Sequence, residues 1–227
     1  QKGLKILSNL NIIIALILFV FILIIGSTAY LLDGYIESLG SYLTHFFELS
    51  TNRNQLNEDG KWFKDWSMFY WVWWISWSPF VGTFIARISK GRTIKEIAIY
   101  GVLIPSLFSF LWMSVLGGTA LDFQLSGITD LSKVVTEDSS LALFKMLENL
   151  PFYEITASLS IFLVATFFIT SSDSGSLVVD LMTSGGKLNA PKGQKVFWAC
   201  MEGAIAIALL IGGGLTALQS ASISTGF

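Results

Sequence analysis

The chain has 227 residues, of which 53% are hydrophobic and 13% charged, and its formal net charge is −2 at pH 7. Soluble domains carry about 25% charged residues, so this composition excludes an ordinary soluble fold. With this charge and no basic patch interleaved with aromatics, nothing points to nucleic-acid binding. The single cysteine and single histidine exclude an intrachain disulfide and a cysteine-based metal site.

Five long runs carry no charge, over residues 6–32, 66–86, 97–121, 155–172 and 203–227. A helix that spans a membrane needs roughly 20 apolar residues. Backbone groups in lipid must be hydrogen-bonded within the segment, and the runs lack the alternation of barrel strands. We therefore predict an all-α polytopic membrane protein. It forms one transmembrane domain over 1–227, with spans at about 8–32, 66–88, 97–121, 155–182 and 196–221.

The connection after the first span contains a predicted surface helix over about 34–48. Apolar residues recur there at helical spacing, at Ile36, Leu39, Leu43, Phe46 and Phe47. An apolar stripe between polar residues is typical of a helix that lies along the membrane surface. The polar stretch over 52–61 predicts a loose connection to the next span.

The second span is rich in tryptophan. Trp73, Trp74 and Trp77 are spaced to share one side of a helix. Indole faces attract cations, and aromatic cages recognise quaternary ammonium groups. Helix packing explains these residues equally well, and an interfacial aromatic belt fits Trp66 nearer the end of the span. Pro79 follows directly and predicts a bend in the helix.

The fourth span contains a polar run from Thr170 to Ser176 that includes Asp173. Hydroxyl and carbonyl oxygens suit a small alkali cation, and Ser and Thr hydroxyls can loosen a helix by bonding to its carbonyls. Small polar residues that hold helices together are an equally good reading. Before this span, Leu141, Phe144 and Leu147 predict a short helix that stops near Pro151.

The fifth span offers weaker signals. Glu202 is expected to extend to the membrane interface rather than to act as a proton relay. Gly212–Gly214 either break the helix or allow close packing, and close packing is the favoured reading. Nine of the 14 Lys and Arg residues fall in segments that are cytoplasmic if the chain starts on that side, which favours a cytoplasmic start in an inner membrane. We find no catalytic triad, paired catalytic carboxylates or phosphate loop, so an enzyme is not expected.

Four stretches together resemble the betaine/choline/carnitine transporter family. They are FYWVWWISWSPFVGTFIARISKGRTIKE at 69–96, FLWMSVLGGTA at 110–120, FLVATFFITSSDSGSLVVDLMTSGG at 162–186 and FWACMEGAIAIALLIGGGLTALQSASI at 197–223. The resemblance implies a leucine-transporter-like fold with two inverted five-helix repeats. The chain is then expected to be an internal fragment, holding the last span of the first repeat and four of the five spans of the second.

The same resemblance implies roles for particular residues. It assigns Trp73, Trp74 and Trp77 to a substrate cage, the carbonyl of Phe167 with Thr170 and Ser171 to one sodium site, Phe80 to the surroundings of a second sodium site, and Phe84 to an external gate. It also implies sodium as the coupling ion with no other cofactor, a small quaternary ammonium substrate, and a homotrimer in the lipid bilayer.

Sodium-coupled uptake of glycine betaine or a related osmoprotectant is the function that these observations favour. A proton-coupled choline transporter and a carnitine exchanger of the same family are alternatives, which sodium dependence of uptake separates. A membrane channel or ligand sensor is an alternative of another class, and saturable, coupled transport excludes it.

Overall fold

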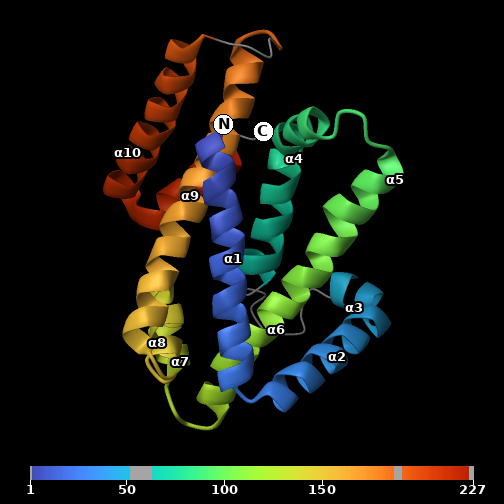
Figure 1. Ribbon diagram of the computed structural model, residues 1–227, viewed down its shortest axis with the longest axis vertical. Helices are drawn as coiled ribbons and strands as arrows, with labels where there is room; N and C mark the ends of the chain where they lie inside the picture. Colours follow the sequence, from blue (N-terminus) through green and yellow to red (C-terminus); the bar gives the residue numbers. More distant parts are fainter. Residues whose placement is uncertain (1, 52–62, 187–190, 225–227) are drawn as a thin grey trace. The chain divides into compact units, whose positions relative to one another are not determined.

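The computed structural model describes residues 2–51, 63–186 and 191–224, and every regular element in these ranges is helical (Figure 1). In chain order the elements are α1 (Lys2–Ile25), α2 (Thr28–Thr44), α3 (Phe46–Thr51), a π-helical turn (Phe63–Met68), α4 (Phe69–Ile88), α5 (Ile94–Ile97), a second π-helical turn (Ala98–Leu103), α6 (Ile104–Leu125), α7 (Leu131–Asp138), a 3₁₀ turn (Ser139–Leu141), α8 (Ala142–Leu147), α9 (Tyr153–Thr183) and α10 (Lys192–Ser224). The loose connection expected over 52–61 lies outside the described residues.

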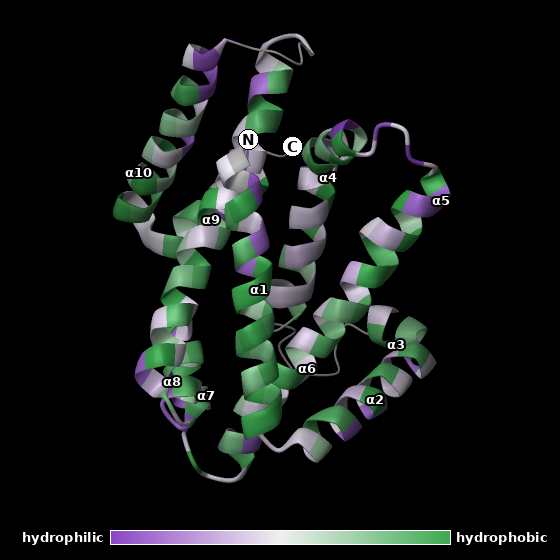
Figure 2. Ribbon diagram, in the orientation of Figure 1, coloured by the Kyte–Doolittle hydropathy of each residue, from purple (hydrophilic) through white to green (hydrophobic). Residues whose placement is uncertain are grey.

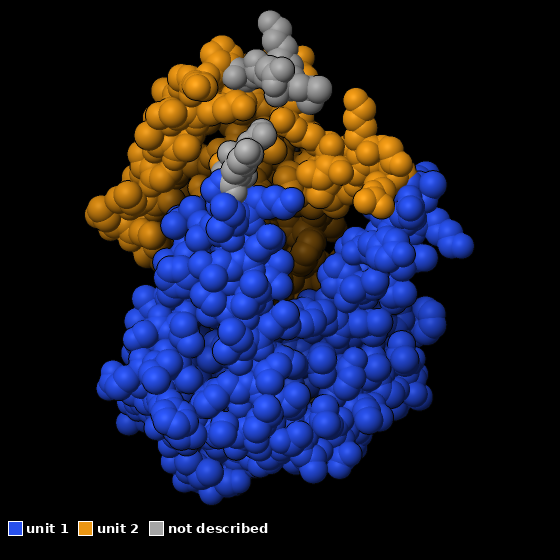
Figure 3. Space-filling model, in the orientation of Figure 1, with its two compact units in different colours: residues 1–49, 93–170 blue, residues 50–92, 171–227 orange. Residues whose placement is uncertain are grey.

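The chain divides into two compact units, which Figure 3 colours separately. Unit 1 comprises residues 1–49 and 93–170, and unit 2 comprises residues 50–92 and 171–227. The boundary falls inside α9, so the first part of this helix belongs to unit 1 and its last part to unit 2. Each unit is described by itself below.

Unit 1 has an apolar core between α1, α2 and α6, which α7 and α8 extend. Ile22, Val115 and Leu147 are completely buried in this core. The uncharged run that predicted a span to residue 32 contains the end of α1 and the start of α2. The chain turns at Gly26, where a Cβ atom would lie 2.8 Å from the carbonyl oxygen of Ile22. Only glycine fits that approach, so the helix ends earlier than its hydropathy indicates.

The amphipathic segment over 34–48 is helical, but it is divided between α2 and α3 at His45. Ile36 and Phe47, which belong to the apolar stripe, are exposed. The ring of Tyr42 packs 5.4 Å from the ring of Phe110, which is one of the contacts between α2 and the spanning helix α6. The exposed apolar stripe is consistent with a helix along the membrane surface.

Four helical segments of the described chain are long and apolar enough to cross a membrane, namely Lys5–Ile25, Ile94–Leu125, Tyr153–Thr183 and Lys192–Ser224. The segment in α1 has the highest mean hydropathy of the four, and Figure 2 colours much of this helix as hydrophobic. The protein is thus an all-α, multi-pass membrane protein. The span predicted over 66–88 forms the 20-residue helix α4. It is not among the four, because Trp, Tyr, Ser and Pro lower its mean hydropathy, and its membrane crossing stays a prediction.

In unit 2, α10 is interrupted rather than closely packed at its glycines. Gly213 and Gly214 have non-helical backbone angles, with φ 64° and ψ −158° at Gly214. A positive φ with this ψ is essentially restricted to glycine. Of the two readings of Gly212–Gly214, the structure therefore shows the helix break and not the favoured close packing. Their effect is to redirect the last part of α10, which lies against α4.

Candidate functional site

The aromatic residues of α4 form two ring clusters along one helix. Trp73 packs against Trp74, with ring centroids 6.5 Å apart, and against Phe69 at 6.0 Å. Trp77 packs edge-on against Phe80 at 5.2 Å. Trp74 is 66% exposed and Trp73 is 36% exposed, whereas Trp77 is half-buried. The structure therefore leaves Trp74 largely exposed, packs Trp73 among neighbouring rings of the same helix and places Trp77 with Phe80.

Trp77 is fixed by a hydrogen bond from its indole Nε1–H to the carbonyl oxygen of Ser222, 3.0 Å away. Ser222 lies in the part of α10 that follows the Gly213–Gly214 interruption. A buried indole N–H needs an acceptor, and the glycine break supplies one by exposing a different stretch of α10 to α4. This contact could not be predicted from the sequence, because nothing in the apolar end of α10 identifies an acceptor for a distant tryptophan.

Pro79 lies inside α4 and lacks the N–H that would bond to the carbonyl of Ile75, four residues earlier. The hydroxyl of Ser78 donates to that carbonyl oxygen at 2.8 Å. The neighbouring hydroxyls of Ser76 and Thr83 bond to the carbonyls of Trp73 and Pro79, at 2.9 and 2.8 Å. Side-chain hydroxyls thus bond to backbone carbonyls around Pro79, directly beside the tryptophans. Phe84, the predicted gate residue, lies half-buried one turn further on.

In α9, two of the predicted sodium ligands lie next to each other. The Thr170 hydroxyl oxygen is 3.0 Å from the carbonyl oxygen of Phe167 and 3.0 Å from that of Thr166. With two acceptors within reach, the hydroxyl hydrogen can turn to Thr166. Ser171 follows directly and is exposed, as is Asp173.

Thr166 also joins α9 to α1 inside unit 1. Its hydroxyl bonds to the side-chain oxygen of Asn11 and to the carbonyl of Phe162, the latter at 2.7 Å. Asn11 is only 1% exposed, and its Nδ2 has no hydrogen-bond partner among the described residues. A buried amide in the middle of an apolar helix is costly unless it is bonded. This pair therefore fixes α9 one residue before Phe167, a role that we did not predict for Asn11.

Replacing Thr166 with valine is expected to lower the free energy of unfolding by about 1–3 kcal/mol, because it leaves the Asn11 amide buried without a partner. The matched control is Thr136→Val, which removes an exposed hydroxyl bonded to the carbonyl four residues earlier at 2.9 Å. It should change stability by less than about 0.5 kcal/mol. Chemical denaturation of the two variants in the same detergent measures the difference. Equal losses would contradict a structural role for the Asn11–Thr166 pair.

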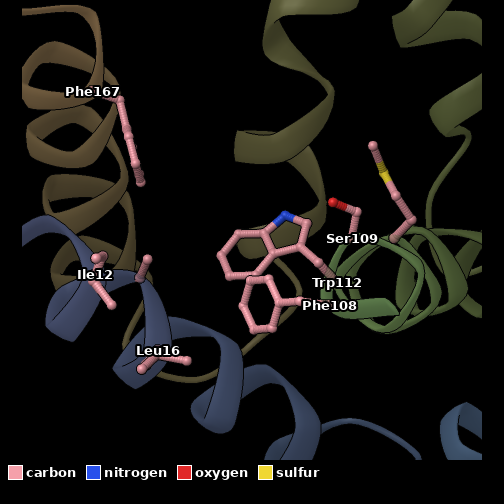
Figure 4. Close-up of a pocket in the computed structure, with 8 residues that line it drawn as sticks. Ile12, Leu16, Phe108, Ser109, Trp112 and Phe167 are labelled. Atoms are coloured by element: carbon pink, nitrogen blue, oxygen red, sulfur yellow. The ribbon is translucent and has the colours of Figure 1, made fainter. Parts of the chain in front are cut away.

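A recess of about 370 Å³ lies in unit 1 next to Phe167 (Figure 4). The residues that line it are Ile12, Ala15, Leu16, Phe108, Ser109, Trp112, Met113 and Phe167. Figure 4 shows the rings of Phe108 and Trp112 together on the side of α6, facing Ile12 and Leu16 of α1. This lining suits hydrocarbon rather than a charged substrate. The recess therefore differs in chemistry from the tryptophan-rich part of α4 and from the oxygen-rich part of α9.

These observations define a multi-pass helical membrane protein with a proline-containing aromatic helix and with neighbouring hydroxyl and carbonyl oxygens in a spanning helix. The sequence profile of the betaine/carnitine/choline family transporters matches residues 1–227, and the chain belongs to that family. Its relatives are transporters and not enzymes.

Individual relatives agree with this assignment. The chain is 47% identical over 226 residues to a glycine betaine/proline/choline transporter of Vibrio parahaemolyticus, covering 100% of this chain and 40% of that protein. It is 47% identical over 226 residues to glycine betaine transporter 1 of the same organism, covering 98% and 43%. It is 41% identical over 223 residues to a glycine betaine transporter of Bacillus subtilis, covering 98% and 43%. The chain thus spans less than half the length of these relatives.

Proposed function

We propose that this chain is part of a secondary transporter that couples sodium entry to the uptake of glycine betaine or a related quaternary ammonium compound. The aromatic helix α4 carries the proposal. A quaternary ammonium group has no N–H to donate, so it is recognised by aromatic faces rather than by hydrogen-bond acceptors. The names of relatives that transport glycine betaine support the same substrate class. The indoles of Trp73, Trp74 and Trp77 would enclose the methylated cation.

The proposed sodium ligands are the carbonyl of Phe167 and the hydroxyls of Thr170 and Ser171. Discontinuous or loosened helices in transporters often present such oxygens to coupling ions. The support in α9 is the 3.0 Å separation of the Thr170 hydroxyl and the Phe167 carbonyl, which puts two hard oxygens within one turn. Phe80 would lie beside a second ion, and Phe84 would close the external path. The working form would be a homotrimer in the inner membrane, with the start of this chain in the cytoplasm.

A mechanism follows from these assignments. Sodium binds the outward-open state and draws the Thr170 hydroxyl and the Phe167 carbonyl to itself, while the hydroxyl hydrogen turns to Thr166. The indoles then close over the trimethylammonium group. The transporter rocks inward and releases both, because neither site binds as tightly when water re-enters.

Uptake of labelled glycine betaine by proteoliposomes of the full-length transporter tests the proposal. We expect saturable uptake that requires an inward sodium gradient and that unlabelled glycine betaine abolishes. Choline is the second candidate substrate, because the name of one Vibrio relative includes it. Uptake driven by a proton gradient without sodium would show that the coupling ion is the proton and not sodium. Flux that does not saturate would show that the protein is a channel and not a transporter.

A further inference from the structure

A second group of polar residues lies between the end of α9 and the start of α10, within unit 2. Asp180 is only 3% exposed, although it lies in a helix that is long and apolar enough to span a membrane. Its Oδ2 is 3.9 Å from the ammonium group of Lys195 in α10. Its Oδ1 has no hydrogen-bond partner among the described residues. One oxygen of a buried carboxylate is therefore left unsatisfied.

Glu202 contributes a second carboxylate to the same place. Its Oε2 accepts a hydrogen bond of 2.6 Å from the hydroxyl of Ser176, and its Oε1 is buried without a partner in the described chain. Extension of Glu202 to the membrane interface, which the sequence suggested, is therefore wrong. The side chain turns inward because Ser176 offers a donor on the facing helix.

The two carboxylates belong to facing sides of α9 and α10, because Asp180 pairs with Lys195 of α10 and Glu202 bonds to Ser176 of α9. The helices α9 and α10 run in opposite directions, and Gln194 bonds to Thr183 at 2.9 Å near the connection (Figure 1). Helical side chains lean toward the start of their own helix. The side chain of Asp180 therefore leans toward Ser176, the residue that bonds to Glu202. The side chain of Glu202 leans along α10 toward the position of Asp180. Ser176 lies one helical turn from Asp180 on the same face of α9.

The charges of this cluster do not balance. Among the described residues it holds two carboxylates and one ammonium group, which leaves a net charge of −1 if all three are ionised. An uncompensated charge and an unbonded carboxylate oxygen are both costly away from water. A single monovalent cation bound by Asp180 Oδ1 and Glu202 Oε1 would remove both costs.

We propose that Asp180, Glu202 and Ser176 form a binding site for one alkali cation, with Na⁺ as the physiological ion. Carboxylate and hydroxyl oxygens are the ligands that hard cations prefer. Asp180 is ten residues beyond Thr170 on the same helix, about 15 Å along its axis at 1.5 Å per residue. The cluster is therefore separate from the sodium ligands proposed at Phe167 and Thr170. Lys195 holds Asp180 in place when the site is empty and limits the affinity for the cation.

Thermal unfolding of the purified full-length transporter in lipid nanodiscs tests this site. The background carries Thr170→Ala, Ser171→Ala and Phe80→Ala, so that neither of the two other proposed sodium sites contributes. At constant ionic strength, with N-methylglucamine replacing Na⁺, saturating Na⁺ is expected to raise Tm by about 2–4 °C. Adding Asp180→Asn and Glu202→Gln should abolish this rise, whereas Glu154→Gln, an exposed carboxylate of α9, should leave it intact. A rise that survives the double replacement, or no rise in the background, overturns the proposal.

Lys195→Met provides a test that does not depend on the stability of the carboxylate variants. Removing the ammonium group should strengthen Na⁺ binding, lowering the half-saturating concentration on the order of tenfold. A purely structural ion pair predicts only a lower Tm with no gain in Na⁺ response. Lys192→Met removes an exposed positive charge one turn earlier in α10 and should shift the half-saturating concentration far less. An unchanged or weaker Na⁺ response in Lys195→Met overturns the proposal.

Discussion

Replacing Trp77 with leucine is expected to raise the glycine betaine concentration for half-maximal uptake by about tenfold in the full-length transporter. Each cation–π contact contributes roughly 0.5–2 kcal/mol, and about 1.4 kcal/mol corresponds to a factor of ten. Leucine also removes the indole N–H that bonds to Ser222 at 3.0 Å. The last part of α10 then loses one of the hydrogen bonds that hold it against α4. Concentration dependence of labelled glycine betaine uptake measures the change.

Two further variants separate these effects. Trp77→Phe keeps an aromatic face but loses the N–H, so it should retain most of the affinity while lowering stability. Trp66→Leu removes a tryptophan of the same helical segment that is 52% exposed and stacks on Tyr70, and it should leave affinity nearly unchanged. If Trp77→Leu leaves affinity at the level of Trp66→Leu, the cage does not include Trp77.

The long uncharged runs indicated where most of the long helices lie, because lipid-facing helices must be apolar along their whole length. The expected spans at 97–121, 155–182 and 196–221 correspond to Ile94–Leu125, Tyr153–Thr183 and Lys192–Ser224. Helix ends and interruptions were harder to place, because they depend on single close contacts. The turn after α1 requires Gly26 to lie against the carbonyl of Ile22, and hydropathy carries no information about such an approach.

For the candidate site too, the sequence predicted which helices are involved but not their individual contacts. Residue types and spacing indicated which helices carry the aromatic and hydroxyl groups, since those groups are unusual in apolar spans. They did not indicate the partners, which come from distant parts of the chain. Ser222 for Trp77, Asn11 for Thr166 and Ser176 for Glu202 are all contacts between helices that only the packed structure brings together. The orientation of the rings also could not be predicted from the sequence. An example is the packing of Trp77 against Phe80 in the structure.

The joint replacement of Thr170 and Ser171 by alanine is expected to raise the sodium concentration for half-maximal uptake by tenfold or more, as an order-of-magnitude estimate for losing two charge–oxygen contacts. The carbonyl of Phe167 alone would remain of the proposed ligands in α9. The helix itself should persist, because alanine has the highest helix propensity and the lost hydroxyl bond of Thr170 is local to α9. Sodium titration of glycine betaine uptake at fixed membrane potential measures the effect.

Ser158→Ala is the control for this replacement, because it removes a hydroxyl of the same helix that donates to the carbonyl of Glu154 at 2.7 Å. Its sodium dependence should match that of the unmodified transporter. The two results together separate coordination from back-bonding, since both replacements remove a hydroxyl bond to a helix carbonyl, but only Thr170 and Ser171 are proposed to contact the ion. An unaltered sodium response in the Thr170/Ser171 variant would mean that the coupling ion binds elsewhere, and the Asp180–Glu202 cluster would then be the first place to look.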